Sequence, residues 1–359
     1  MGIFVALLVL SFLIFFHELG HFSAARLFGV QVDVFSIGFG KRLFTKQIGK
    51  TEWSISAIPL GGYVKMKGQD DADPTAVNYD DDSYTSKKPW QKIVILLAGP
   101  FANFLMAFML YFTASQMGTY LSPLFNYSSY MSATVGNFSE DSPAKRAGIE
   151  KGDTILQINN QPINSWEDVG ETIQLYDGVL SFNILREDQK IDIQIKPTIK
   201  TQKNRFGEEV KRKLIGIAPQ VPEEKLEFSP SQGLSFAWNE TLYASTMIFK
   251  SVQKLITGAV PADQLGGVIS IVDITAKASA SGILALLFFT SLISVNLGVL
   301  NLLPIPALDG GHIMFNLYEM ITGKTASEEV MYRLTLIGWA MLLSLMFLGL
   351  YNDINRLLG

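Results

Sequence analysis

Long apolar runs separated by polar intervals dominate the chain. The runs lie at 3–28, 93–118, 278–303 and 334–350, and only the first contains histidine or charged residues. A helix of about 20 residues, at ~1.5 Å each, crosses a ~30 Å hydrocarbon layer. The pattern therefore predicts four transmembrane helices. The buried helices of a large soluble protein are a poorer explanation, because uncharged runs of this length are uncommon there.

The orientation of the predicted spans follows from the basic residues. The first run lacks the basic segment and the clear cleavage site of a signal peptide, so we expect it to be retained as a span. Loops rich in Lys and Arg stay in the cytoplasm, and ten such residues fall between 24 and 92. This loop and the 304–333 loop are therefore predicted to be cytoplasmic, with both termini and the stretch between the second and third spans outside.

Between about 133 and 198 the pattern changes to that of a half-buried sheet. Thr154–Ile158 and Ile191–Ile195 alternate apolar and polar residues, as strands with one buried face do. Ser165 followed by Asp168 is an N-cap signal for a short helix that runs toward Leu175. A small β-rich domain is therefore predicted between the second and third spans.

The segment 234–256 fits two interpretations. Its apolar residues recur at helical spacing and its charges are few, so it could form a fifth span. An amphipathic helix at the outer membrane surface suits the pattern better, and an even number of spans keeps the later loops on consistent sides. We therefore expect a surface helix.

The composition excludes several kinds of partner and catalytic site. The formal net charge is −4 and 17% of the residues are charged, so there is no basic excess for binding nucleic acid. The absence of cysteine excludes disulfides, thiol catalysis and metal sites with Cys ligands. Of the three histidines, two lie in the first apolar run.

His17, Glu18 and His21 form the pattern H-E-x-x-H. Histidines at i and i+4 lie on one helical face, so both imidazoles can bind one metal while the glutamate takes a proton from water. Ionisable side chains inside a membrane are costly and mark functional sites. His17 lies about 21 Å along the helix from Ile3, which predicts a metal site in the hydrocarbon layer, nearer its cytoplasmic side.

A catalytic zinc ion takes three protein ligands and keeps a fourth position open. The third ligand can come from the segment after the third run, where Pro304 and Pro306 end the regular helix. Irregular backbone at membrane depth is tolerated around a cavity. Asp309 and His312 are the candidates there.

The stretch from Ser142 to Asn159 resembles the central part of a PDZ domain, because its small residues, its glycines and Asp153 have the expected spacing. PDZ domains bind extended peptide ends by strand addition between a strand and a helix. The resemblance implies one peptide-binding domain, and a purely structural β-domain is the alternative.

H-E-x-x-H in the first span, paired with N-x-x-P-x-P-x-L-D-G-G-H at 301–312, resembles the site-2 protease family of intramembrane zinc metalloproteases. The bacterial regulator-of-sigma-E branch is the most similar, and the resemblance covers nearly the whole chain. It implies one catalytic Zn²⁺ ion, with Glu18 as the catalytic acid/base. The implied zinc ligands are His17, His21 and Asp309, so that Asp309 is preferred to His312.

The resemblance also implies substrate-binding residues. Asn301 matches an asparagine that holds the substrate backbone near the metal. The segment 59–66 matches a membrane-associated β-loop that clamps the unwound substrate as an added strand. The candidate residues of this loop are Gly61, Gly62, Tyr63 and Val64. A motif of the second span, Ala98-Gly99-Pro100 with Asn103, matches as well, and we interpret its role as packing of the core helices.

The predicted fold class is a polytopic α-helical membrane protein with four transmembrane helices, a membrane-associated β-loop and an inserted extracytoplasmic PDZ domain of the β-rich α+β type. The predicted layout is transmembrane helix 1 at 1–28, a cytoplasmic loop with a β-hairpin at 29–92, transmembrane helix 2 at 93–118, an extracytoplasmic region at 119–231 with the PDZ domain at about 133–198, an extracytoplasmic amphipathic helical segment at 232–277, transmembrane helix 3 with the second motif at 278–312, a cytoplasmic loop at 313–333, transmembrane helix 4 at 334–351 and an extracytoplasmic tail at 352–359.

These features predict an intramembrane zinc metalloendopeptidase of the bacterial inner membrane, with its PDZ domain in the periplasm. The resemblance implies substrates such as single-span anti-sigma factors and signal-peptide remnants, cut within the bilayer in regulated intramembrane proteolysis. The expected partners are these substrates, peptide ends at the PDZ domain and the lipid bilayer, with no nucleic acid. A catalytically inactive scaffold relative is the main alternative. A transporter or channel would more often show internal repeats or more spans.

Overall fold

The computed structural model describes residues 2–69, 78–118, 127–203, 209–220, 227–259, 261–262 and 265–358. The chain divides into two compact units. Residues 1–117, 229–253 and 261–359 form the first, here called the helical unit, and residues 118–228 and 254–260 form the second, the β unit.

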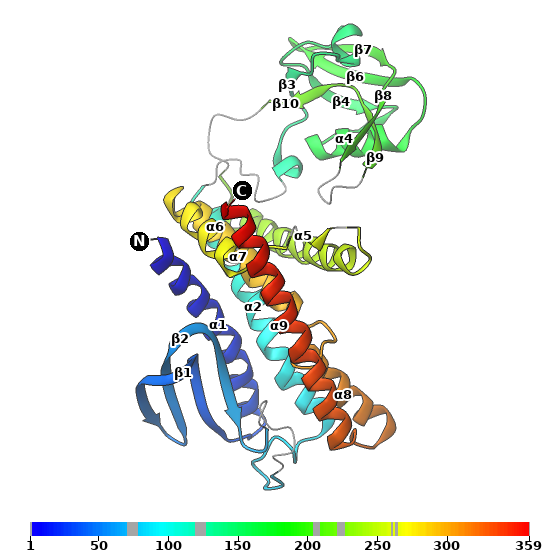
Figure 1. Ribbon diagram of the computed structural model, residues 1–359. Helices are drawn as coiled ribbons and strands as arrows, with labels where there is room; N and C mark the ends of the chain where they lie inside the picture. The colour runs from blue at the N-terminus through cyan, green and yellow to red at the C-terminus, as the bar shows by residue number, and fades with distance from the viewer. Residues whose placement is uncertain are drawn as a thin grey trace. The chain divides into compact units, whose positions relative to one another are not determined.

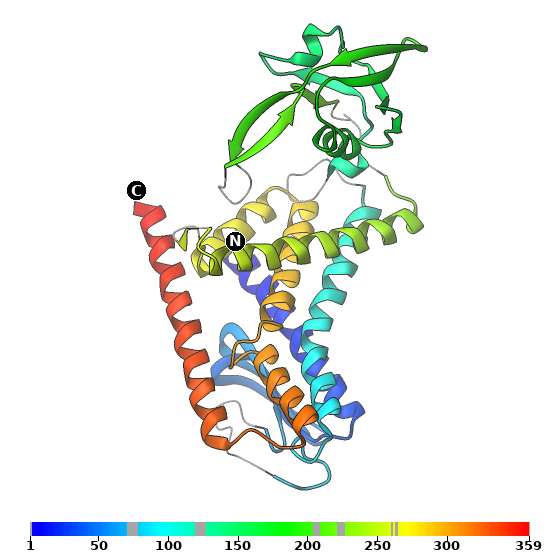
Figure 2. The same cartoon turned by 90° about the vertical axis from the view of Figure 1, so that its right-hand side faces the viewer.

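The helical unit contains the apolar runs as helices. Four helices in the described part of the chain are long and apolar enough to cross a membrane, namely α1 (Gly2–Leu27), α2 (Pro89–Gln116), α7 (Ile283–Asn301) and α9 (Glu328–Leu358). Helix α2 packs against both α1 and α7, and α9 contacts α6 (Val268–Ala280) (Figures 1 and 2). The helices predicted from the apolar runs are therefore confirmed as helices.

The third apolar run is not one continuous helix. Its first residues, Ala278 to Ala280, belong to α6, and Gly282, with φ of +113°, turns the chain into α7. Charge and hydropathy could not reveal this break, because neither Ser281 nor Gly282 carries a charge. The segment 232–277, predicted to be helical, contains most of α5 (Pro230–Ile256) and of α6, and α6 packs against α1.

Helix α5 (Pro230–Ile256) is the helix expected at 234–256, and it is not one of the four helices apolar enough to span. On one face Phe236 is buried and meets Phe288 of α7 edge-on, with ring centroids 6.2 Å apart. On another face Leu234, Trp238 and Leu242 stay exposed. The pattern is that of a helix with one face on the protein and an apolar stripe facing outward.

Beside α1 lies a sheet made of one long antiparallel hairpin, β1 (Val32–Ile48) and β2 (Thr51–Met66) (Figure 1). The hairpin folds back on itself, so the beginning of β1 pairs with both 52–58 and 62–66 of β2. Gly38 and Gly40, both at positive φ, lie at the bend in β1. The stretch 62–66 pairs on one side only among the described strands, which makes it an edge strand.

The β unit contains a four-stranded antiparallel sheet in the order β5-β4-β6-β7, together with the pairs β10-β3 and β8-β9. Its elements are η1 (Tyr127–Tyr130), β3 (Val135–Phe138), α3 (Pro143–Arg146), β4 (Thr154–Ile158), β5 (Gln161–Pro162), α4 (Trp166–Leu175), β6 (Leu180–Arg186), β7 (Gln189–Ile195), β8 (Thr198–Lys203), β9 (Glu209–Leu214) and β10 (Ile217–Pro219). The strand predicted at Thr154–Ile158 is confirmed, and the strand predicted at Ile191–Ile195 forms most of β7. The short helix is also confirmed as α4, with Ser165 and Asp168 forming a capping box at its start.

The β unit extends past residue 198, where we expected the PDZ domain to end. The hairpin β8–β9 follows, and β10 then returns to pair with β3 near the start of the unit. The closing strand lies far along the chain from the motif at 142–159, so that motif could not locate the end of the unit. The core between these strands contains Val135, Ile155 and Phe182, all fully buried.

The aspartate of the PDZ-like motif has a structural role. Asp153 is buried and receives two hydrogen bonds from Arg186, Nε to Oδ1 at 2.8 Å and Nη2 to Oδ2 at 2.7 Å. Burial of the Asp153 carboxylate opposes its ionisation, but the hydrogen bonds from Arg186 and from the backbone of Glu150 outweigh burial, and its pKa is lowered. The pair joins the start of β4 to the end of β6.

Candidate metal centre

The two histidines of H-E-x-x-H lie side by side on α1. Their Nε2 atoms are 3.2 Å apart. The apolar sequence around them favours one uninterrupted helix of 26 residues, which fixes the i, i+4 spacing on one face. His21 and Glu18 are buried, with 6% and 9% of their surface exposed. Helix α1 alone therefore provides two ligand atoms and a carboxylate at one place.

A tight turn brings Asp309 to the same place. Helix α7 ends at Asn301, and α8 (Asp309–Thr322) begins at Asp309 itself. Between them Ala307 has a φ of +94°, a conformation rarely adopted by residues with a side chain. A side chain at Gly310 or Gly311 would collide with the backbone carbonyls of this turn. The glycines of L-D-G-G-H are therefore required for the turn, and the turn directs Asp309 back toward α1.

The three predicted ligands meet. His17 Nε2 lies 3.4 Å from Asp309 Oδ2, and His21 Nε2 lies 3.4 Å from Asp309 Oδ1. With one ligand atom taken from each residue, the three atoms lie within 4.8 Å of one another. Ligand atoms about 2.0–2.1 Å from a tetrahedral zinc ion lie about 3.3–3.4 Å apart, so the cluster is of the size that one ion requires. Asp309 Oδ2 is buried and accepts no hydrogen bond from a described group, as expected for an oxygen that binds a metal. The three residues therefore fit a zinc ion.

The protonation of His21 also fits a metal ligand. Its Nδ1 lies 2.9 Å from the backbone oxygen of Ile95 on α2. A carbonyl can only accept, so Nδ1 carries the hydrogen and the lone pair of Nε2 is free to bind a metal. Helices α1 and α2 approach closely here. A side chain at Gly20 would collide with the Ala98 carbonyl, and a side chain at Gly99 would collide with the His21 ring. Ala98 and Gly99 of the second-span motif thus lie where the two helices pack closely, in agreement with the packing role expected for the motif. The carbonyl that meets His21 belongs to Ile95, outside the motif, and sequence reasoning missed it.

A cavity of about 990 Å³ opens beside this cluster in the helical unit. His17, Glu18 and Asp309 line it, and so does Asn301, the last residue of α7. The other predicted substrate-binding residues that line it are Gly61, Gly62, Tyr63 and Val64, on the edge stretch of β2. A side chain at Gly62 would collide with Ile14 and the Ser36 carbonyl and would press on Glu18, so the strand reaches α1 only because this residue is glycine.

Two further observations bear on the predicted site. His312, the rival ligand, lines a small neighbouring cavity of about 100 Å³ but is not part of the described metal-ligating cluster. Helix α9 contributes Tyr332, Thr335, Leu336 and Trp339 to the wall of the larger cavity. Sequence reasoning missed these α9 residues, because a span that is apolar on all sides gives no signal of which side lines a cavity.

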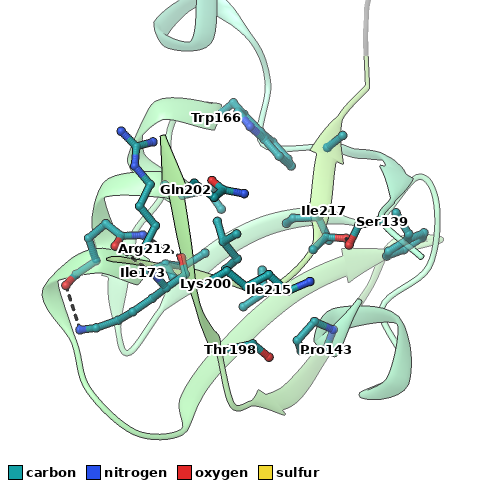
Figure 3. Close-up of a pocket in the computed structure, with 18 of the residues that line it drawn as sticks. Ser139, Pro143, Trp166, Ile173, Thr198, Lys200, Gln202, Arg212, Ile215 and Ile217 are labelled. Atoms are coloured by element: carbon teal, nitrogen blue, oxygen red, sulfur yellow. Dashed lines mark hydrogen bonds between the residues drawn. The ribbon is translucent and has the colours of Figure 1, made fainter. Parts of the chain in front are cut away.

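The β unit has a hollow of its own, of about 960 Å³, between α4 and β10 (Figure 3). Trp166 and Ile173 of α4, with Ile215 and Ile217 at β10, provide apolar side chains, and Lys200 and Arg212 line the side formed by β8 and β9. Gln174 holds this hairpin to the end of α4 through hydrogen bonds with the backbone of Lys213, at 2.8 and 3.1 Å.

The backbone oxygens of the loop before β10 are hydrogen-bonded to the segment 139–144. The Ile215 oxygen accepts hydrogen bonds from Ala144 N and Ser142 Oγ, both at 3.0 Å, and the Gly216 oxygen accepts one from Ser139 N at 3.0 Å. In a trans peptide the N–H points opposite to the C=O, so the N–H groups of Gly216 and Ile217 face away from these partners. Among the described strands β10 pairs with β3 alone, so its other edge is open.

The fold and the cluster together define a class of protein: a metal-dependent hydrolase whose site lies on helices apolar enough to cross a membrane. The sequence model of peptidase family M50, the site-2 protease family, matches residues 5–345, and the chain belongs to this family. It is a membrane zinc metalloprotease.

Curated proteins of similar sequence match this chain over nearly its whole length. A Campylobacter jejuni protein, named "Putative zinc metalloprotease", is 44% identical over 98% of this chain and 93% of its own. Relatives of the same printed name from Helicobacter pylori strain J99 and Agrobacterium fabrum are 39% and 33% identical, over 99% and 98% of this chain and 99% and 95% of their own. Among solved structures, the PDZ domain of an SdrC-like protein from Listeria monocytogenes matches 25% of this chain and 88% of its own, with 22% identity and a TM-score of 0.20.

Proposed function

We propose that this metalloprotease cleaves single-span membrane proteins within the bilayer, through a zinc ion held by His17, His21 and Asp309. The observation that carries the proposal is the meeting of His17, His21 and Asp309 in one cluster, with both histidines on a helix apolar enough to span. Glu18 between the histidines supplies the acid–base residue that such a site needs. A catalytically inactive relative would more often lack one of these four residues.

The proposed mechanism assigns a task to each side chain. When bound, zinc supplies a Lewis acid that polarises a carbonyl and lowers the pKa of a water. Glu18 takes a proton from the attacking water and passes it to the leaving nitrogen, so the peptide bond breaks as the new carbon–oxygen bond forms. Asn301, which lines the same cavity, is placed to bind the substrate backbone.

An edge strand beside Glu18 suits a substrate that arrives as a helix. A transmembrane helix hides its carbonyls in its own hydrogen bonds, so it must unwind before water can attack. Gly61 to Val64 line the cavity, and the stretch 62–66 pairs on one side only among the described strands. An unwound substrate segment could pair with this edge strand, and backbone hydrogen bonds to the strand would then replace the hydrogen bonds that the helix lost.

The proposal also covers the location of the protein and its substrates. We propose an inner-membrane location with the β unit in the periplasm, because the basic residues between 24 and 92 favour a cytoplasmic loop. The proposed substrates are anti-sigma-factor-like proteins and signal-peptide remnants, cut in regulated intramembrane proteolysis. The lipid bilayer itself is a proposed partner of the exposed apolar stripe on α5.

Metal removal tests the proposed activity. The purified full chain should contain one zinc ion and cleave members of a panel of transmembrane peptides in detergent. A chelator should abolish cleavage and added zinc should restore it, because no protein side chain replaces the Lewis acid. A folded, zinc-loaded chain that leaves every peptide in the panel intact would favour the inactive-relative alternative.

We propose further that the groove of the β unit binds peptide ends. The backbone N–H groups of Gly216 and Ile217, which line the groove, can receive a terminal carboxylate, and the apolar side chains of Ile173 and Ile215 can receive the last side chain. Amidating the last residue of a bound peptide is expected to weaken its binding to the full chain by about 10–100-fold, the value of a hydrogen-bonded charge.

Isothermal calorimetry on matched peptides measures this effect. Each peptide ends in an apolar residue and is compared with a C-terminally amidated copy, while an N-terminally acetylated copy serves as the control and should bind equally well. Equal affinity of the free and amidated ends would contradict recognition of a carboxylate.

A further inference from the structure

Asn103 of α2 occupies an unusual position for a residue expected only to pack helices. It is fully buried, and its side-chain Nδ2 lies 3.1 Å from Nδ1 of His17. Its backbone oxygen accepts a hydrogen bond from Ser294 Oγ of α7 at 2.7 Å. Its Oδ1 is buried without a hydrogen-bond partner in the described part of the chain. Asn103 therefore joins α2 to both α1 and α7 beside the metal cluster.

The neighbour of a metal-binding histidine must accept a hydrogen bond from its second ring nitrogen. A histidine that binds a metal through Nε2 carries its hydrogen on Nδ1, and this N–H needs an acceptor. For His21 the acceptor is the Ile95 carbonyl. For His17, the group that meets Nδ1 among the described residues is the Asn103 amide.

The amide can present either of its two atoms to His17. A half-turn about its last bond exchanges nitrogen and oxygen at the same positions. With Nδ2 toward the ring, Nδ1 of His17 must accept, and the ring hydrogen then occupies Nε2, where it blocks a metal. With Oδ1 toward the ring, Nδ1–H donates and Nε2 is free. Either orientation leaves one amide atom without a described partner, so binding of the metal is what selects between them.

We propose that Asn103 is a positioning residue of the metal centre, whose side-chain oxygen accepts the hydrogen bond from Nδ1–H of His17 and so keeps Nε2 directed at the metal. The inference rests on the proposed ligand set and goes beyond it, because it gives the second-span motif a role in metal binding. Outer partners of metal ligands contribute about 10–100-fold in metal affinity or activity.

Three substitutions in the full chain separate this role from packing. Asn103→Leu keeps the size and removes the acceptor, so it should weaken zinc binding by about 10–100-fold. Asn103→Asp keeps an acceptor and removes the donor, so its zinc affinity should stay within about threefold of the wild-type chain or become tighter. Ser294→Ala removes only the hydrogen bond to the backbone of Asn103 and should leave zinc affinity unchanged.

The measurements are the zinc dissociation constant, by competition with a chromogenic chelator, and the visible spectrum of the Co²⁺-loaded chain. The Leu variant should shift the cobalt bands, and the Ser294 variant should not. If the Leu variant does not fold, Asn103→Ala removes the acceptor with a smaller side chain and should show the same loss.

The outcomes distinguish this inference from the proposed function. Wild-type affinity in the variants that lack an acceptor, or failure of a folded Asp variant to bind zinc, would overturn the role of Asn103 and leave the ligand set standing. A wild-type chain without zinc, or an unchanged zinc affinity in His17→Ala, would instead overturn the metal centre itself, and the inference with it.

Discussion

Replacing Glu18 with glutamine is expected to lower kcat for a transmembrane peptide by about 10²–10⁴-fold, the usual contribution of general acid–base catalysis. Glutamine has nearly the shape of glutamate but cannot take a proton from water at neutral pH. Glu18 is buried on α1 between the two histidines and lines the cavity that also holds Asn301. Zinc content should stay at that of the wild-type chain, because the three ligands remain.

Glu240→Gln is the matched control for this variant. Glu240 is a second buried glutamate of the helical unit, on α5, and it does not line the cavity at the metal cluster. Neutralising it tests whether loss of a buried carboxylate alone impairs the enzyme, and cleavage should continue. Cleavage by the Glu18 variant at the wild-type rate, with zinc bound, would show that another group takes the proton from the attacking water.

Replacing Asp309 with alanine is expected to weaken zinc binding by more than about 100-fold, beyond the effect of losing an outer-shell partner. The carboxylate is the single ligand that the second motif brings to the cluster, and both of its oxygens face a histidine nitrogen at 3.4 Å. With two ligands left, the site loses the three-ligand set that catalytic zinc requires. Peptide cleavage should disappear together with the zinc.

His312→Ala provides the comparison for this prediction. His312 lies on the same helix three residues further on and is the alternative ligand that the sequence left open. It is outside the described cluster, so its removal should leave zinc content unchanged. Zinc retained in the Asp309 variant and lost in the His312 variant, by metal analysis of the purified chains, would reverse the assignment.

The local elements were predictable from sequence because local patterns dictate them. The apolar runs give helices, and the capping pair Ser165 and Asp168 gives α4 where it was expected. The pair His17 and His21 needs only helical periodicity to share a face. A motif resemblance was enough to name Asp309 as a partner, although more than 280 residues separate it from these histidines.

Other features depend on packing between distant segments and had no local signal. The end of the β unit is set by β10 pairing with β3, across the whole length of the unit. The role of Asn103 depends on how α2 lies against α1, and a buried asparagine in an apolar helix does not itself indicate which neighbour it meets.

Sequence by itself thus determined the elements and the chemical groups: apolar helices, a β-rich insert, two histidines with a glutamate, and an aspartate in a glycine-rich turn. Tertiary structure decided which of these groups meet. The side chains of His17, His21 and Asp309 meet where glycines at 20 and 99 let α1 and α2 approach closely and glycines at 310 and 311 form the turn before α8. The approach of α1 to α2 is a property of two surfaces in contact, and neither helix alone encodes it.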